Sequence, residues 1–146
     1  MSQEIKVKKS NIPSFIDETI YDYKSKLLQL LNAPYIKFDK NLHGSLPEKA
    51  GIYRISIIGA DWDKTVYIGR SIDLRRRISK NHFEGSRRNS TLRRKMIKNG
   101  GFENEESVEE YLRELCVVQL LLEEDEKKRS WIEHFAISVL QPAFND

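Results

Sequence analysis

The chain of 146 residues has the length of a single globular domain. Charged residues make up 32% of it and hydrophobic residues 39%, which supports a modest core and excludes a fully disordered chain. One cysteine, Cys116, excludes an internal disulfide framework and a zinc site with paired cysteine ligands. No apolar stretch is typical of a signal peptide or approaches the roughly 20 residues of a membrane span. We therefore expect a cytoplasmic protein, associated with the nucleoid or in a eukaryotic nucleus, with no membrane partner.

The net charge of +3 is small, but the charges are unevenly distributed. Window 64–98 holds twelve basic and two acidic residues, a balance of +10, whereas window 101–129 holds four basic and ten acidic residues, a balance of −6. Arginine outnumbers lysine eight to four in the basic window, and the guanidinium group suits phosphate oxygens. This favours contact with a polyanion, with a solvated charged surface as the alternative.

The first third of the chain predicts one long helix followed by a loop. Apolar residues recur at three- and four-residue steps over 14–32, which predicts an amphipathic helix with Ser14 as its cap. Residues 33–50 are expected to form loop or irregular structure. We expect 1–50 to be an N-terminal helical extension whose helix packs on the rest of the chain or forms a dimer contact, so a homodimer is an open alternative.

The remaining residues predict alternating strands and helices. Strands rich in Ile and Tyr, over 51–58 and 65–69, flank a turn at 59–64 and should pair as a hairpin. A buried third strand is expected over 115–122, with a helix as the alternative that periodicity alone does not exclude. Helices are expected over 72–83, 91–98 and 123–140, and a short amphipathic turn or helix over 107–113. The helix over 123–140 should have Trp131, Ile132, Phe135, Ala136, Val139 and Leu140 on its inner side. The order predicts an α+β fold, a small, mainly antiparallel sheet of three strands flanked by helices.

Five residues in this order supply the groups that phosphodiester hydrolysis needs. Carboxylate suits a hard cation, arginine suits phosphate, and tyrosine or histidine can orient or deprotonate water. Tyr53 and Tyr67 lie on the paired strands, Arg70 and Arg77 follow them, and Glu133 is a lone acid on an apolar helix face. Many basic proteins hold such residues, so their types alone do not establish the chemistry.

Three sequence blocks resemble the GIY-YIG nuclease family. Gly-Ile-Tyr at 51–53 and Tyr-Ile-Gly at 67–69 are separated by thirteen residues, and both tripeptides match fully. A basic residue follows the second glycine and an arginine lies ten residues after the second tyrosine. The closing helix carries a glutamate, a Gln-Pro pair and an asparagine twelve residues after the glutamate. The resemblance covers residues 51–146, which it implies to be the nuclease domain.

The resemblance implies metal-dependent cleavage of DNA. Tyr53 would lie near the attacking water as general base, alone or jointly with Tyr67. Arg77 would hold and polarise the scissile phosphate. Arg70 replaces the lysine often found at its position and would contact the phosphate or the water. Gly51 would permit close backbone approach, as would the glycine of the second tripeptide.

Glu133 is implied to be the single carboxylate ligand of Mg²⁺ or Mn²⁺, with waters completing the shell. Asn145 would brace the site by hydrogen bonds. The family usually places a histidine or tyrosine four residues after the arginine at Arg77, where this chain has Asn81. His82 follows one residue later, and in an α-helix a one-residue shift turns a side chain by about 100°. A small local shift would let His82 serve in proton transfer, and whether His82 or Asn81 fills the position is left open.

Other basic residues are expected to grip the DNA backbone non-specifically, helped by a helix start at Ser90 or Thr91. They are Arg75, Arg76, Lys80, Arg87, Arg88, Arg93, Arg94 and Lys95. The expected biological use is restriction, structure-selective or repair-associated cleavage, or a mobile element. The alternatives are a catalytically inert nucleic-acid-binding module on the same fold and a basic protein with an acidic partner.

Overall fold

The computed structural model describes residues 11–59 and 64–146, so most of the expected turn at 59–64 lies outside the described residues. The elements in chain order are α1 (Asn11–Leu31), β1 (Ile36–Lys37), α2 (Leu42–Ser45), β2 (Gly51–Ile57), β3 (Lys64–Ser71), η1 (Arg76–Phe83), α3 (Thr91–Asn99), α4 (Glu105–Leu115), β4 (Cys116–Leu122) and α5 (Glu126–Leu140). Within the described residues no helix is long and apolar enough to cross a membrane.

The sheet has the order β1-β4-β2-β3, and all of its strand pairs are antiparallel. The expected hairpin is present, and β4 confirms the expected third strand. Nearly every residue of β2 is buried, as its central place between β4 and β3 requires. The prediction of three strands misses β1, which was expected to be loop, because a two-residue strand shows no periodicity and exists only through its pairing with β4.

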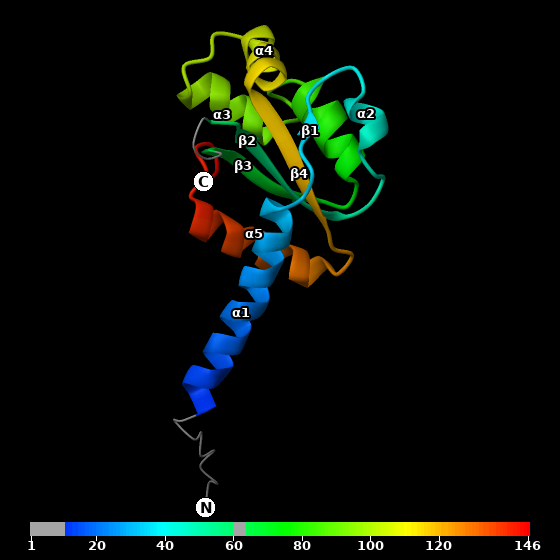
Figure 1. The fold of residues 1–146 in the computed structure, drawn as a ribbon. Coiled ribbons are helices and arrows are strands. Elements are labelled where there is room, and N and C mark those ends of the chain that lie inside the picture. Colours follow the sequence, from blue (N-terminus) through cyan, green and yellow to red (C-terminus); the bar gives the residue numbers. More distant parts are fainter. Residues whose placement is uncertain (1–10, 60–63) are drawn as a thin grey trace, which may run out of the picture.

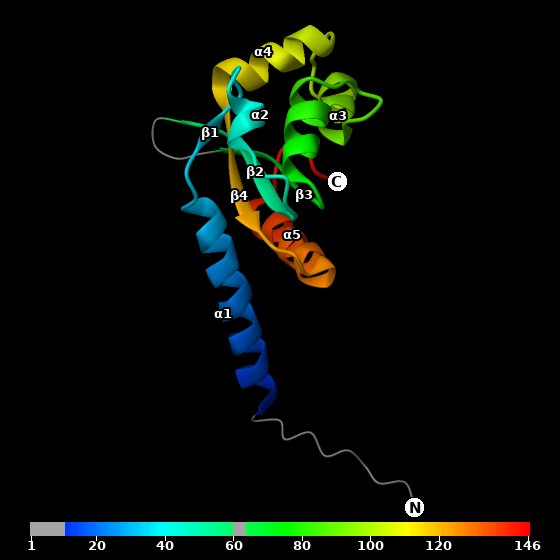
Figure 2. The ribbon, with the colours of Figure 1, turned by 90° about the vertical axis from the view of Figure 1, so that its right-hand side faces the viewer.

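Helices cover both faces of this sheet (Figures 1 and 2). Strand residues alternate between faces, so Tyr53 and Tyr67 face the larger core cluster, to which α2, η1, α3 and α4 contribute. Ile52 and Ile68 face the opposite side, where the second cluster joins the sheet to α1 and α5. β3 is an edge strand of the sheet and lies between the two layers.

Residues after α1 are part of the main core. Phe38, Leu42 and Leu46 are fully buried in the larger cluster, and β1 belongs to the sheet. A division of the chain at residue 50 remains a prediction. The segment that stands apart in space is α1, whose N-terminal half extends away from the rest of the molecule in both views (Figures 1 and 2).

Buried polar side chains anchor the end of α1 to the sheet. Gln119 on β4 donates from Nε2 to the carbonyls of Leu31 (2.8 Å), the last residue of α1, and Ala33 (2.9 Å), just after the helix. Carbonyl groups at a helix end have no partner within the helix, so Gln119 supplies one. Arg54 on β2 donates to Gln119 Oε1 (2.8 Å). Residues 11–13, before the expected start, are already helical, so Ser14 lies inside the helix and the expectation that it caps the helix is wrong.

Two helices differ from expectation in ways that affect the site. The helix expected over 72–83 is largely a π-helix, η1, in which hydrogen bonds join residues five apart, as in Glu84 N–H to Ser79 O at 2.9 Å. On α5, Trp131 and Val139 were expected to face inward, but they are 53% and 52% exposed. Their side of α5 is left uncovered, because α5 packs mainly through Ile132 and Ala136.

Candidate active site

Tyr53 and Tyr67 lie side by side on one face of the β2–β3 hairpin, with ring centroids 6.2 Å apart. Tyr53 is paired in register with Gly69, and Tyr67 with Ile55. A Cβ atom at position 69 would overlap the phenol of Tyr53. Gly69 is therefore required because the Tyr53 ring lies across it, which explains a glycine within a strand.

A chain of hydrogen bonds runs from Tyr53 into the helical layer. The Tyr53 hydroxyl is 2.5 Å from His82 Nε2, and His82 Nδ1 is 2.6 Å from Ser90 Oγ. The three side chains are at most 1% exposed. Ser90 is the N-cap of α3 and accepts the backbone N–H of Arg93 at 3.1 Å. The His82 imidazole is therefore hydrogen-bonded at both nitrogens, and the bond from Nδ1 to Ser90 attaches it to the start of α3.

The π-helix decides between Asn81 and His82. In an α-helix the residue four after Arg77 shares its face, whereas hydrogen bonds five residues apart in η1 bring the fifth residue to that place. His82 is the fifth residue and turns inward to Tyr53. Asn81 lines a shallow surface pocket of about 310 Å³ together with Arg76 and Arg77. The wide turns of η1 thus place a histidine one residue later than the family pattern does.

Burial and charge keep both partners of this hydrogen bond neutral near pH 7. Burial raises the pKa of Tyr53, and the neighbouring Tyr67 adds to the rise. Burial also lowers the pKa of His82 well below its usual value, and the positive charges of Arg77 and Arg93 lower it further. Tyr53 therefore keeps its proton while the imidazole has a free lone pair to accept one.

Arg77 lies beside both phenols, where its charge and hydrogen bonding counteract part of the rise in their pKa values. Its side chain is half-buried and donates from Nη1 to the Asn89 carbonyl at 3.2 Å. Burial also raises the pKa of Tyr67, but at 8% exposure this residue lies nearer to solvent than Tyr53 does. A phosphate that reached Arg77 would meet both tyrosines.

Glu133 reaches the site from α5, on the opposite face of the sheet. Its Oε1 forms an ion pair with Arg70 Nη1 and lies 3.9 Å from His134 Nε2. The Glu133 side chain is 13% exposed and its negative charge contributes to the raised pKa values of Tyr53 and Tyr67. The candidate site thus wraps around the β3 edge, with a carboxylate from one helical layer and tyrosines from the other.

Glu133 has the donor chemistry that a hard divalent cation requires. Its contacts with described residues go through Oε1, which leaves Oε2 to a further ligand. In the part of the chain that the structure describes, no group of three or more His, Cys, Asp or Glu side chains could hold a metal ion. A cation here would therefore take Glu133 as its protein ligand and complete its shell with water or phosphate oxygens, as Mg²⁺ commonly does.

Asn145 binds the backbone of β3 from the C-terminal segment. Its Oδ1 accepts the Ile68 N–H at 2.9 Å, and its Nδ2 donates to the Ile68 carbonyl at 2.8 Å. The preceding backbone N–H of Phe144 donates to the Val66 carbonyl at 3.0 Å. The C-terminal segment therefore occupies the outer edge of β3 just before Gly69, where the two layers of the site meet.

A comparison of the sequence with known families decides the assignment. A family model described as the GIY-YIG catalytic domain matches residues 49–141, well over half of the chain. The chain belongs to the GIY-YIG family. Since the match is to the catalytic domain, the protein is a nuclease. No curated protein matches the chain in sequence.

Two solved structures resemble this GIY-YIG chain. Both are of the GIY-YIG N-terminal endonuclease domain of UvrC from Thermotoga maritima, in two point mutants that were bound to the catalytic divalent cation. The sequence identities are 17% and 16%, and the TM-scores are 0.42 and 0.41. Each match covers 74% of this chain and 98% of the other.

The basic residues of the GIY-YIG domain divide into two groups. Arg75, Lys80, Arg87 and Lys95 are ion-paired with Glu48, Glu84, Glu105 and Asp146. Arg76, Arg88 and Arg94 are exposed, and none of them forms an ion pair with any described residue. No ion pair with a described residue offsets the charges of these three arginines, so they are the best placed of the group to contact a phosphate backbone.

The expectation that Arg93 contacts DNA is wrong, because the side chain is only 1% exposed. It donates to the carbonyls of His82 (2.5 Å), Phe83 and Glu105 (3.1 Å) and to the Glu105 carboxylate (3.0 Å). These bonds tie the end of η1 to the start of α4. The local sequence, a run of basic residues, does not indicate that the Arg93 side chain is buried.

The contact of Ser90 with His82 could not be predicted from the sequence. A helix start at Ser90 or Thr91 was expected, and Ser90 is the N-cap, but its contact with His82 depends on the course of the chain between η1 and α3. A capping residue can be predicted from local sequence alone. The second contact of the Ser90 hydroxyl, with His82, leaves no such signal, because it depends on how the chain folds.

Proposed function

We propose that this GIY-YIG domain is a metal-dependent DNA endonuclease in which Tyr53 and His82 together remove a proton from the attacking water. The observation that carries the proposal is the buried 2.5 Å hydrogen bond between Tyr53 and His82 beside Arg77. A buried tyrosine with a raised pKa is a poor base on its own. It becomes a relay when a neutral imidazole can accept the proton that it holds.

The proton steps follow from these protonation states. The Tyr53 phenol gives its proton to His82 Nε2 as it takes one from water, and His82 Nδ1–H donates to Ser90 Oγ. The water oxygen forms a bond to phosphorus while the bond from phosphorus to the leaving oxygen breaks, and the leaving oxygen takes a proton from solvent. Tyr67, nearer to solvent, orients the water or the phosphate.

Substrate binding would strengthen the relay through Arg77. The charge of Arg77 is the second cause of the lowered pKa of His82, after burial. A bound phosphate offsets that charge, so the imidazole becomes a better base when the substrate is present. Arg77 then serves twice, since it also stabilises charge on the phosphoryl oxygens in the transition state.

Glu133 is proposed to hold Mg²⁺ or Mn²⁺, which when bound would stabilise negative charge on the phosphate. In this role Oε2 of Glu133 would hold the cation, while Oε1 keeps its ion pair with Arg70. The guanidinium of Arg70 is 43% exposed and would contact a phosphate bound beside the cation. Asn145 keeps the strand that carries Tyr67 and Arg70 in place.

The exposed Arg76, Arg88 and Arg94 support DNA as the substrate, because arginine contacts to the phosphate backbone give affinity without reading sequence. Restriction-like and structure-selective cleavage both fit this arrangement. An inert binding module would need these arginines but would have no need of a neutral histidine bonded to a buried tyrosine.

A cleavage assay tests the proposal. Supercoiled plasmid, branched and flapped DNAs and matched RNAs are incubated with Mg²⁺ or Mn²⁺, with EDTA as the metal-free control. Glu133→Gln should abolish cleavage, whereas Glu126→Gln, at an exposed position of the same helix, should leave it intact. Tyr53→Phe should lower the rate about 10²- to 10⁴-fold. Salt-sensitive DNA binding without metal-dependent cleavage of any substrate would favour the inert module instead.

A further inference from the structure

Ile72 is the most exposed large apolar side chain in the described part of the chain. It is 79% exposed and lies in the short connection between β3, which ends at Ser71, and η1, which begins at Arg76. Single exposed apolar residues are common on protein surfaces, so exposure alone assigns no role to Ile72. Its role follows from how the chain holds it and from which residues surround it.

The connection anchors Ile72 on both sides. Ser71 Oγ accepts the Asp73 N–H at 3.0 Å and donates to the Asp73 carbonyl at 2.9 Å. Leu74 is fully buried, and its N–H donates to the Lys49 carbonyl at 2.9 Å. Ile72 therefore projects from a turn whose neighbours are fixed, and a partner that covers it would have little backbone to order.

The surroundings of Ile72 are positively charged. Segment 70–77 holds four arginines and one aspartate. Ile72 lines the shallow pocket of about 310 Å³ that Arg76, Arg77 and Asn81 also line. Arg77 is the residue proposed to hold the scissile phosphate, so a DNA strand bound there would bring its sugars and bases next to Ile72.

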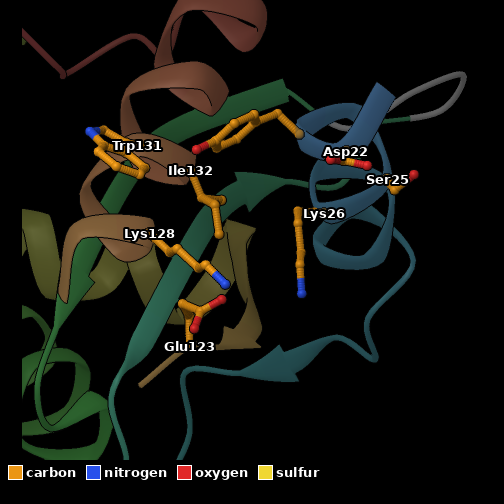
Figure 3. A pocket seen from close by; sticks show the side chains of 8 residues that line it. Asp22, Ser25, Lys26, Glu123, Lys128, Trp131 and Ile132 are labelled. Carbon is orange, nitrogen blue, oxygen red and sulfur yellow. The ribbon is translucent and has the colours of Figure 1, made fainter. Parts of the chain in front are cut away.

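Two other exposed apolar side chains lie in a different charge environment. Trp131 is 53% exposed and lines a pocket of about 350 Å³ formed by α1 and α5 (Figure 3). Two acids and two lysines line the same pocket, namely Asp22, Glu123, Lys26 and Lys128. Phe15 is 69% exposed on α1, a helix that holds three acids and two lysines. The charge therefore favours a polyanion at Ile72 and not at Trp131 or Phe15.

We propose that Ile72 inserts as an apolar wedge between stacked bases of DNA, beside the phosphate that Arg77 holds. Isoleucine is one of the residues that proteins insert between base steps in this way. The bases would cover a side chain that water otherwise surrounds, which favours the bound state. The inference rests on DNA as the proposed substrate of this site.

Insertion of Ile72 names the class of DNA that the site prefers. Separating two stacked bases costs free energy, and the cost is smallest where the bases are already mispaired or unpaired. The wedge therefore favours structure-selective cleavage, at mismatches, branch points or flaps, over restriction-like cleavage. Within fully paired DNA, the flexible pyrimidine–purine steps would be the preferred places of insertion.

DNA binding by the full chain in EDTA tests the insertion without any cleavage. The probes are two duplexes of equal length, one fully paired and one with a central mismatch. Each carries 2-aminopurine beside its centre, a base whose fluorescence rises when its stacking is lost. The wild-type protein should bind the mismatched duplex about tenfold more tightly than the paired one and should raise the fluorescence.

Variants at position 72 assign these two effects to the side chain. Ile72→Ser should lose most of the preference and of the fluorescence rise, whereas Ile72→Leu should retain both, because leucine is also an effective wedge. Trp131→Ser is the matched control, since it also removes an exposed apolar side chain, and it should behave as the wild type.

The outcomes separate this inference from the nuclease proposal. Equal affinity of the wild type for both duplexes, or a preference that Ile72→Ser retains, would overturn the insertion and leave the nuclease proposal standing. Failure of the wild type to bind any duplex would overturn both, since DNA would then not be the substrate. Because no metal is present, a protein that cleaves nothing can still pass this test.

Discussion

Arg93 and Arg94 follow one another on α3, yet only Arg94 reaches solvent. Arg93 is enclosed between η1 and α4, where four oxygen atoms satisfy its guanidinium group. Removing a buried charge of this kind lowers stability, because its hydrogen-bond partners stay buried and are left unpaired. Of these two adjacent arginines, Arg93 stabilises the fold, and Arg94 has the proposed contact with the substrate.

This difference predicts opposite effects for matched variants. Arg93→Gln should lower the free energy of unfolding by about 3 kcal/mol, whereas Arg94→Gln should change it by less than about 0.5 kcal/mol. Arg94→Gln should instead weaken DNA binding and lower the salt dependence of affinity by about one phosphate contact. Urea unfolding and salt-titrated DNA binding measure the two quantities. Equal stability of both variants would contradict the buried role of Arg93.

His82 makes stability depend on pH. Its pKa in the folded chain lies well below its ordinary value of 6.5, so below about pH 6.5 the unfolded chain binds more protons than the folded chain. Folding stability contributed by neutral His82 is therefore present above pH 6.5 and is lost as pH falls below it. The loss should approach about 1.4 kcal/mol per pH unit for this one group.

Urea unfolding at pH 7.5, 6.5 and 5.5 checks this prediction. The fall in stability between pH 6.5 and 5.5 should be smaller in His82→Gln than in the wild type. His134→Gln, at a position 67% exposed, should keep the wild-type slope. The His82→Gln protein should also lose cleavage activity, since an amide cannot accept the proton of Tyr53. An unchanged slope in His82→Gln would show that His82 titrates normally.

At the scale of elements, the β2–β3 hairpin and η1 together bring Tyr53 and His82 into contact. The hairpin supplies Tyr53 across Gly69, and η1 supplies His82 through its wide turns. π-Helical turns are rare and are often found at functional sites. The hydrogen bond between them fixes how closely the helix lies on the sheet, so small shifts in either element should reach the chemistry.

Gly69→Ala tests this dependence. The added methyl group overlaps the Tyr53 phenol, so the variant should lose about 1–3 kcal/mol of stability and most of its cleavage activity. Gly44→Ala on α2 is the control, since a methyl group there meets no atom within 4 Å. That change should be neutral or slightly stabilising in a helix. Thermal unfolding and cleavage rates distinguish the two, and normal activity of Gly69→Ala would show that Tyr53 can move without cost.

At the scale of the whole molecule, the last residues of the chain complete a site whose first tyrosine lies some ninety residues earlier. The C-terminal segment binds the open edge of β3, and Asn145 bonds both backbone groups of Ile68. An edge strand with unpaired backbone groups is otherwise free to fray or to pair with another chain. The tail therefore stabilises the strand that carries Tyr67 and Arg70.

Asn145→Ala should remove both hydrogen bonds at a cost of about 1–2 kcal/mol. Hydrogen exchange at the Ile68 amide should become faster, and cleavage should slow because the strand is less well held. Asp146→Asn, at a side chain 94% exposed, is the control and should leave exchange at Ile68 unchanged. If Ile68 stayed protected in Asn145→Ala, the tail would not be what holds this edge.

Much of this protein could be predicted from local patterns in its sequence. Strand and helix periodicity gave the hairpin, the β4 strand and the order of most helices, because neighbouring residues set these preferences. Spaced tripeptides, with an arginine, a glutamate and an asparagine at fixed intervals, indicated the family and its candidate residues. A cap at Ser90 or Thr91 was predicted from local sequence, since the capping bond joins residues three apart, and the structure has Ser90 in this place.

Only the tertiary structure decided which of these residues meet. The π-helical turns that bring His82 rather than Asn81 to Tyr53, the burial of Arg93 and the outward side of Trp131 all depend on packing between distant elements. The two-residue strand β1 exists only because β4 is beside it. Local sequence determines the propensities of a segment, but a partner far along the chain determines whether a charge is buried, an edge is paired or a proton has an acceptor.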